Sequence, residues 1–245
     1  MSDAVRSFNL SSGSSGGTSR RRIYKMEHAR RHMAAAALSL IFVLQPRLSH
    51  AETQQEAPIV NLDNALIATM KSGTTGASFE SRYEVLKPVL ESAYDIPAVL
   101  EDSVGLSWAT LPVIQRDELE NVFEQYIVAS YIKGYSLYQG QKLEILPMER
   151  HVGKTVIVDT QIVPSNGDAP IQIDYVLTQN SNQWKIIDVL LGGTISKVAV
   201  ESSDFSSLVS DGDASKLISA LQAKVISLSG DASINERQVV AATGS

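Results

Sequence analysis

The feature that most constrains the fold is a change in the apolar period near residue 143. From there to residue 191, apolar and polar side chains alternate along four segments that are separated by short connections. A period of two is typical of strands with one buried face, and short connections join neighbouring antiparallel strands. The expected strands are Leu143–Arg150, Lys154–Val163, Ile171–Gln179 and Gln183–Leu191. The sequence therefore predicts a four-stranded antiparallel meander with one apolar face.

Helical periodicity flanks this meander on both sides. The expected helices begin near Ile59, after Ser78, at Pro97 and after Pro112, and two more cover residues 195–209 and 214–228. We expect Ser78 to cap its helix and Pro88 to kink or divide the same helix. Because the apolar face of a sheet must be covered, the predicted fold class is α+β, with the helices packed on one face of the meander.

The first 51 residues have the three parts of a secretory signal peptide. A basic cluster in residues 20–31 precedes an uncharged, mostly apolar run from Met33 to Leu44, and the small-x-Ala step Ser49-His50-Ala51 follows. The 12 residues of the apolar run are too few to span a bilayer. We therefore favour a leader that is cleaved near Ala51 over an uncleaved anchor, with export through the Sec or the twin-arginine route.

The predicted domain organisation follows from this leader. Residues 52–228 are expected to form one domain, and residues 229–245 a polar, disordered tail. Residues 52–245 carry 13 basic and 25 acidic side chains, a formal charge of −12, which disfavours binding to nucleic-acid phosphate. The chain has no cysteine, which excludes disulfides, thiolate zinc sites and cysteine nucleophiles.

The sequence contains no recognisable catalytic constellation. His151 is the only histidine after the leader, and its place in a predicted turn favours a solvated side chain over a catalytic base. Neither a Gly-x-Ser-x-Gly elbow nor a phosphate-binding glycine loop occurs. We therefore expect no catalytic residue, no metal and no cofactor.

Three aspartates lie in the predicted strands. Alternation places Asp159 and Asp174 on the polar face of the sheet. Asp188 shares its parity with Trp184 and Ile186, so it is the one strand carboxylate expected to face inward. Apolar faces of the helices and of the sheet also need burial, but periodicity leaves open whether they fill a core or line a cavity.

Two motifs resemble a known family. The first is FESRYEVLKPVL at Phe79–Leu90, followed by Tyr94-Asp95, and the second is WKIIDVLLGGTIS at Trp184–Ser196. Gly105–Trp108 and Tyr131-Ile132 lie between them in the expected order. Together these motifs are similar to the MlaC-type periplasmic lipid-binding family, also called the toluene-tolerance family.

The resemblance covers about residues 58–228. Many members of the family carry a Tyr-Arg pair where this chain has Glu201-Ser202. Residues 193–196 and 203–205 look more like the hopanoid-associated branch of the family, HpnM.

This resemblance implies an NTF2-like or cystatin-like domain that acts as a periplasmic lipid carrier. Such a carrier shields phospholipid or hopanoid tails in an apolar cavity and shuttles them between the inner and outer membranes. Its implied partners are an inner-membrane lipid transporter and an outer-membrane lipoprotein complex, and it is implied to be a monomer. Two alternatives stay open: an NTF2-like enzyme with Asp188 as acid or base, and a non-lipid periplasmic adaptor.

The expected lining of the lipid cavity consists of the apolar faces of the family-like helices and strands. These residues are Phe79, Tyr83, Leu86, Phe123, Ile127, Tyr131, Ile173, Tyr175, Leu177, Trp184 and Ile186.

Overall fold

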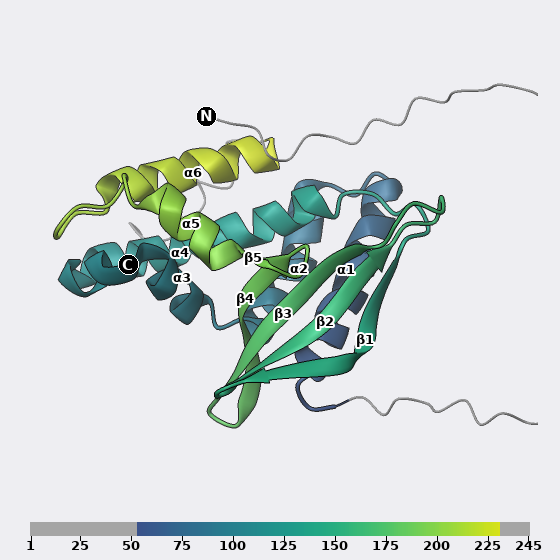
Figure 1. Ribbon diagram of the computed structural model, residues 1–245. Coiled ribbons are helices and arrows are strands. Elements are labelled where there is room, and N and C mark those ends of the chain that lie inside the picture. The colour runs from purple at the N-terminus through teal and green to yellow at the C-terminus, as the bar shows by residue number, and fades with distance from the viewer. Residues whose placement is uncertain (1–52, 231–245) are drawn as a thin grey trace, which may run out of the picture. The chain divides into compact units, whose positions relative to one another are not determined.

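A computed structural model describes residues 53–230 (Figure 1). The helices of this part are α1 (Ala57–Thr74), α2 (Phe79–Ala93), α3 (Ile96–Val104), the 3₁₀-helix η1 (Gly105–Thr110), α4 (Val113–Gly134), α5 (Lys197–Phe205) and α6 (Ser215–Ser229). The strands are β1 (Lys142–Val152), β2 (Thr155–Val163), β3 (Ile171–Asn180), β4 (Gln183–Leu191) and β5 (Ile195–Ser196). The predicted leader over residues 1–51 and nearly all of the predicted tail over residues 229–245 lie outside the described residues.

The sheet is an antiparallel meander in the order β1-β2-β3-β4-β5. This confirms the predicted α+β class and the order of the strands, but the described sheet has five strands and not the expected four. The additional strand β5 pairs with the last two residues of β4. Gly192 and Gly193 make this return possible, because both have positive φ angles and form the tight turn between the strands.

The helices begin and end close to where the sequence predicts. The Ser78 hydroxyl accepts a hydrogen bond from the Ser81 amide at 3.2 Å, which is the expected cap of α2. Helix α2 runs unbroken through Pro88, so this proline does not divide the helix, contrary to one of the two expected outcomes. Pro88 and Glu84 are both exposed, so the Glu84 carbonyl that loses its helical partner lies on the solvated side of α2.

One face of the sheet is covered by helices and forms the core. Val158 of β2 pairs with Tyr175 of β3, and both side chains are buried. Helices α1 and α2 lie behind the sheet, whereas α3, α5 and α6 gather beyond its β4 edge (Figure 1). Among residues 53–230, no helix combines the length and apolarity needed to cross a membrane.

The opposite face of the sheet carries the polar side chains that alternate with the core residues along the strands. Asp159 and Asp174 lie on it, as alternation predicts, and the Arg150 guanidinium forms ion pairs with both. Gln172 also donates to the Asp174 carboxylate at 3.0 Å. Arg150 and Gln172 thus explain how Asp174 can be fully buried without leaving an uncompensated charge.

A β-bulge in β4 changes the alternation of its side chains. Val176 pairs with Asp188, but the next residue of β3, Leu177, pairs with Ile186, so Ile187 is the extra residue. Asp188 therefore does not share the phase of Ile186. The parity argument for Asp188 is therefore wrong, because the bulge lies between the two residues, although the Asp188 side chain still borders a small inner pocket together with residues of α4.

Candidate functional site

A cavity of about 210 Å³ opens between α4, the inner face of β3 and β4, and the start of α5. Its wall is almost entirely apolar. The lining residues are Ile127, Ser130, Tyr131, Tyr135, Ile173, Tyr175, Val189, Leu191 and Lys197.

Helix α4 contributes one continuous face to this cavity. Ile127 and Tyr131 are four residues apart, which places them one above the other on the same side of α4, and Tyr135 follows directly after the helix ends. Opposite them, Ile173 and Tyr175 alternate along β3 and so point to the same side of the sheet.

The bulge in β4 completes the wall. Val189 pairs with Tyr175, and Leu191 pairs with Ile173, so both side chains fall in phase with the inner face of β3. With regular alternation from Ile186, Asp188 and Leu190 would take these two places. The cavity therefore depends on an irregularity of the strand and not on its mean pattern.

A cluster of tyrosines lies at the inner end of the cavity. The Tyr131 hydroxyl contacts the Tyr94 hydroxyl, and the Tyr131 ring stacks on Tyr135 with ring centroids 5.7 Å apart. Burial raises the pKa of Tyr131 to about 12, and it raises the pKa of Tyr175 well above its ordinary value. These hydroxyls are therefore neutral at physiological pH and can donate hydrogen bonds.

Helix α1 brings a carboxylic acid towards the same tyrosines. Burial raises the pKa of Asp63 to about 7, and the charge of Asp63 in turn raises the pKa of Tyr131, Tyr135 and Tyr175. Near neutral pH a large fraction of Asp63 is thus protonated and uncharged.

Lys197 lies at the open end of the cavity. Its ammonium group forms an ion pair with Glu201, one turn further along α5, and lies 5.5 Å from the centre of the Tyr126 ring. Burial opposes the charge of Lys197, but Glu201, Tyr126 and Asp188 outweigh it and raise the pKa of Lys197 above its ordinary value.

Asp188 fixes the start of α5. Its carboxylate accepts hydrogen bonds from the Ser196 hydroxyl at 2.6 Å, the Val198 amide at 3.0 Å and its neighbouring Val189 amide at 2.7 Å. It also borders a side pocket of about 30 Å³ next to the main cavity. Both carboxylate oxygens are engaged, so the residue on which the enzyme alternative depends acts here as a helix cap.

All eleven predicted lining residues belong to the hydrophobic core or pack against it, and four of them also line the cavity. Ile127, Tyr131, Ile173 and Tyr175 are these four. The other seven are Phe79, Tyr83, Leu86, Phe123, Leu177, Trp184 and Ile186. Their role in lipid binding stays a prediction.

Sequence reasoning missed five of the lining residues. They are Ser130, Tyr135, Val189, Leu191 and Lys197. Tyr135 had a usable signal, because it follows Tyr131 by one helical turn. Val189 and Leu191 had none, since the bulge that turns them inward leaves no mark in the apolar pattern.

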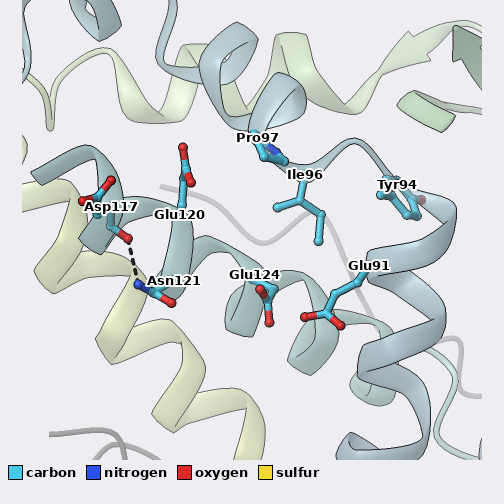
Figure 2. A pocket seen from close by; sticks show the side chains of 8 residues that line it. All are labelled: Glu91, Tyr94, Ile96, Pro97, Asp117, Glu120, Asn121 and Glu124. Atoms are coloured by element: carbon cyan, nitrogen blue, oxygen red, sulfur yellow. Dashed lines mark hydrogen bonds between the residues drawn. The ribbon is translucent and has the colours of Figure 1, made fainter. Parts of the chain in front are cut away.

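A second hollow of about 360 Å³ is acidic and lies between the end of α2, the start of α3 and the outer face of α4. Figure 2 shows Glu91, Asp117, Glu120 and Glu124 around it, with the Asn121 amide bonded to the Asp117 carbonyl at 2.9 Å. Such a polar lining is unsuited to lipid tails. Across residues 53–230, no three potential metal-ligating side chains are grouped to hold a metal ion.

Two comparisons relate this chain to known proteins. The sequence model of the MlaC protein family matches residues 61–223. The solved structure of a phospholipid-binding protein from Ralstonia solanacearum, in complex with a phospholipid, superposes with a TM-score of 0.62 at 17% identity. The match covers 72% of this chain and 99% of that one, and it shows a shared fold.

Proposed function

Because the chain belongs to the MlaC family, we propose that it is a lipid carrier that holds lipid tails in the cavity between α4 and the sheet. The observation that carries this proposal is the almost purely apolar wall of that cavity. Each methylene group removed from water stabilises the complex by about 0.8 kcal/mol. A dozen such groups contribute roughly 10 kcal/mol before the cost of ordering the lipid and the protein.

The ligand that we propose first is a phospholipid. This choice is supported by the structural neighbour from Ralstonia solanacearum, which is a phospholipid-binding protein. A hopanoid is the second candidate, and its support is the similarity of residues 193–196 and 203–205 to the HpnM branch.

The size of the cavity adds a condition to this proposal. Pockets that enclose a drug-sized molecule measure about 300–1,000 Å³, whereas this cavity measures about 210 Å³. A lipid with two acyl chains needs more room than that. We infer that loading widens the space between α4 and the sheet.

We also propose a cellular role. After export to the periplasm and loss of residues 1–51, the protein would shuttle lipid between the inner and outer membranes. It would receive or deliver that lipid through an inner-membrane transporter and an outer-membrane lipoprotein complex. The support for this role is membership of the MlaC family together with the signal-like N-terminus.

The test of lipid binding is native mass spectrometry of gently purified protein, followed by extraction and identification of the bound lipid. Ile127→Glu should abolish lipid retention, because it places a carboxylate in the apolar wall, where Ile127 is only 6% exposed. Ile114→Glu is the matched control, since it makes the same change at a position of α4 that is 73% exposed. Wild-type occupancy in a folded Ile127→Glu protein would refute the proposed site.

A further inference from the structure

Lys197 is the only charged side chain among the described residues that line the cavity. It lies at the open end: the Lys197 side chain is 36% exposed and Leu191 is 43% exposed, whereas Ile127 and Tyr175 are buried. A lipid whose tails enter this cavity keeps its polar headgroup near water, because burying that headgroup would cost its hydration. The headgroup therefore lies beside Lys197.

The positive charge at this position is already neutralised. The Lys197 ammonium is paired with Glu201, whose side chain is only 7% exposed. The Glu201 carboxylate also accepts a bond from the Ser103 hydroxyl at 3.4 Å, which ties it to α3. Asp188 adds a second carboxylate near Lys197, held by the amides at the start of α5. One ammonium thus faces two carboxylates, and no free positive charge is left for a lipid phosphate.

This charge balance treats headgroups differently. An anionic headgroup can bind Lys197 only in competition with Glu201, and displacing a buried carboxylate from its cation is strongly unfavourable. If Glu201 stays in place, the anionic headgroup instead approaches a site with an excess of negative charge. A zwitterionic or uncharged headgroup does not have to displace Glu201, and its zero net charge is not repelled by the excess of negative charge.

We propose that the Lys197–Glu201 pair is a headgroup-charge filter, which admits lipids without net charge and disfavours anionic lipids that carry the same tails. The filter rests on the proposed carrier function, because it acts only on lipids that the cavity holds. It assigns a specificity role to two charged residues of α5: Lys197, which lines the cavity, and Glu201, which pairs with it.

The experiment offers two headgroups with identical tails. Delipidated protein is incubated with vesicles of equal parts dioleoyl-phosphatidylethanolamine and dioleoyl-phosphatidylglycerol, reisolated and extracted, and the bound lipids are quantified by mass spectrometry. In the wild-type protein we expect the ethanolamine lipid to be enriched about fivefold over the vesicle ratio. This enrichment corresponds to a difference in binding free energy of roughly 1 kcal/mol between the two lipids. Equal uptake of both lipids would overturn the filter and leave the carrier function standing. Uptake of neither would overturn the choice of a phospholipid as ligand and the filter with it.

Variants then identify the residues responsible. Glu201→Gln keeps the shape of the side chain but frees the Lys197 charge, so the bound ratio should shift towards phosphatidylglycerol. The double variant Lys197→Met/Glu201→Gln removes both charges, and its bound lipids should match the vesicle ratio. Glu118→Gln, at an exposed position of α4, makes the same change in net charge and should keep the wild-type ratio. An unchanged ratio in both a folded Glu201→Gln protein and the double variant would overturn the filter.

Discussion

At Gly73, helix α1 approaches the chain that follows α4 so closely that no side chain fits. A Cβ atom there would lie 2.2 Å from the Ser136 carbonyl oxygen and 3.0 Å from Nη1 of Arg82. Gly73→Ala should therefore lower the free energy of unfolding by about 1–3 kcal/mol, because backbone must shift to relieve the clash. Urea denaturation measures this change.

Gly134 provides the control for this prediction. It also lies in the last turn of a helix, but a Cβ atom there would meet nothing within 4 Å. Gly134→Ala should leave stability unchanged or raise it slightly, since alanine reduces the freedom of the unfolded chain. Equal losses in both variants would mean that the close approach at Gly73 is not the cause.

Asp63 gives the protein a pH-dependent stability. Its pKa is about 7 in the folded protein and 3.8 in the absence of burial, so the folded state holds this proton more tightly than the unfolded state. The stability of the wild-type protein should therefore fall as the pH rises from about 4 to 7 and level off above that. The full loss is on the order of 4 kcal/mol.

Asp63→Asn isolates this effect. The variant has no proton to lose at this position, so its stability should exceed that of the wild type at pH 8 by more than it does at pH 5. All other titrating groups are common to both proteins. Their contributions therefore cancel when the free energy of unfolding of the wild type is subtracted from that of the variant at each pH. Parallel curves between pH 5 and 8 would contradict a buried, protonated Asp63.

At the scale of elements, the end of β4 and the start of α5 form one unit. The Asp188 carboxylate binds the Ser196 hydroxyl and the Val198 amide, and Ser196 in turn accepts a bond from the Ala199 amide at 3.0 Å. Asp188→Ala should lower the free energy of unfolding by about 1–2 kcal/mol, as expected for a lost helix cap. Because α5 carries Lys197 and Glu201, the same change should also weaken headgroup discrimination.

Asp204→Ala is the comparison for this effect. Asp204 is exposed near the carboxyl end of α5, where a negative charge opposes the helix dipole. Its removal should be neutral or slightly stabilising in the same urea titration. A loss at Asp204 as large as that at Asp188 would argue against the cap.

The elements also show what could be read from the sequence. The four long strands were predictable because strict alternation and Gly- and Asn-rich connections are local properties. The bulge at Ile187 was not, since Ile186 and Ile187 are both apolar and either phase of β4 satisfies the pattern. That hidden shift broke the parity argument for Asp188 and concealed Val189 and Leu191 as lining residues.

At the scale of the whole molecule, the question is which apolar side chains are packed in the core and which also line the cavity. Phe123 and Leu86 have the same apolar character and helical spacing as Ile127 and Tyr131, yet the first two are fully buried in the core. Whether an apolar side chain meets a packed neighbour or borders a cavity depends on how closely the layers approach each other at that point, which is a property of the assembled fold. Apolar faces therefore predicted the layers of this protein correctly without fixing where the layers stay apart.

The rate of lipid delivery should also depend on properties of the whole molecule, namely its net charge and the size of its cavity. Residues 52–245 have a formal charge of −12, which repels anionic membrane surfaces at long range. A cavity of about 210 Å³ must in addition widen to load or release a lipid with two chains. We therefore expect slow transfer from loaded protein to anionic liposomes alone, and fast transfer when the cognate membrane transporter is present.

Ionic strength and liposome charge separate the two causes. If repulsion limits the encounter, transfer to anionic liposomes should accelerate as salt is raised from low ionic strength to about 0.15 M, where charges are screened beyond roughly 8 Å. Transfer to uncharged liposomes should show little dependence on salt and report the widening step by itself. The assay follows a fluorescent phospholipid that is dequenched on arrival in the acceptor bilayer. Fast transfer to anionic liposomes without the transporter, independent of salt, would contradict delivery through a protein partner, because neither repulsion nor widening would then limit release.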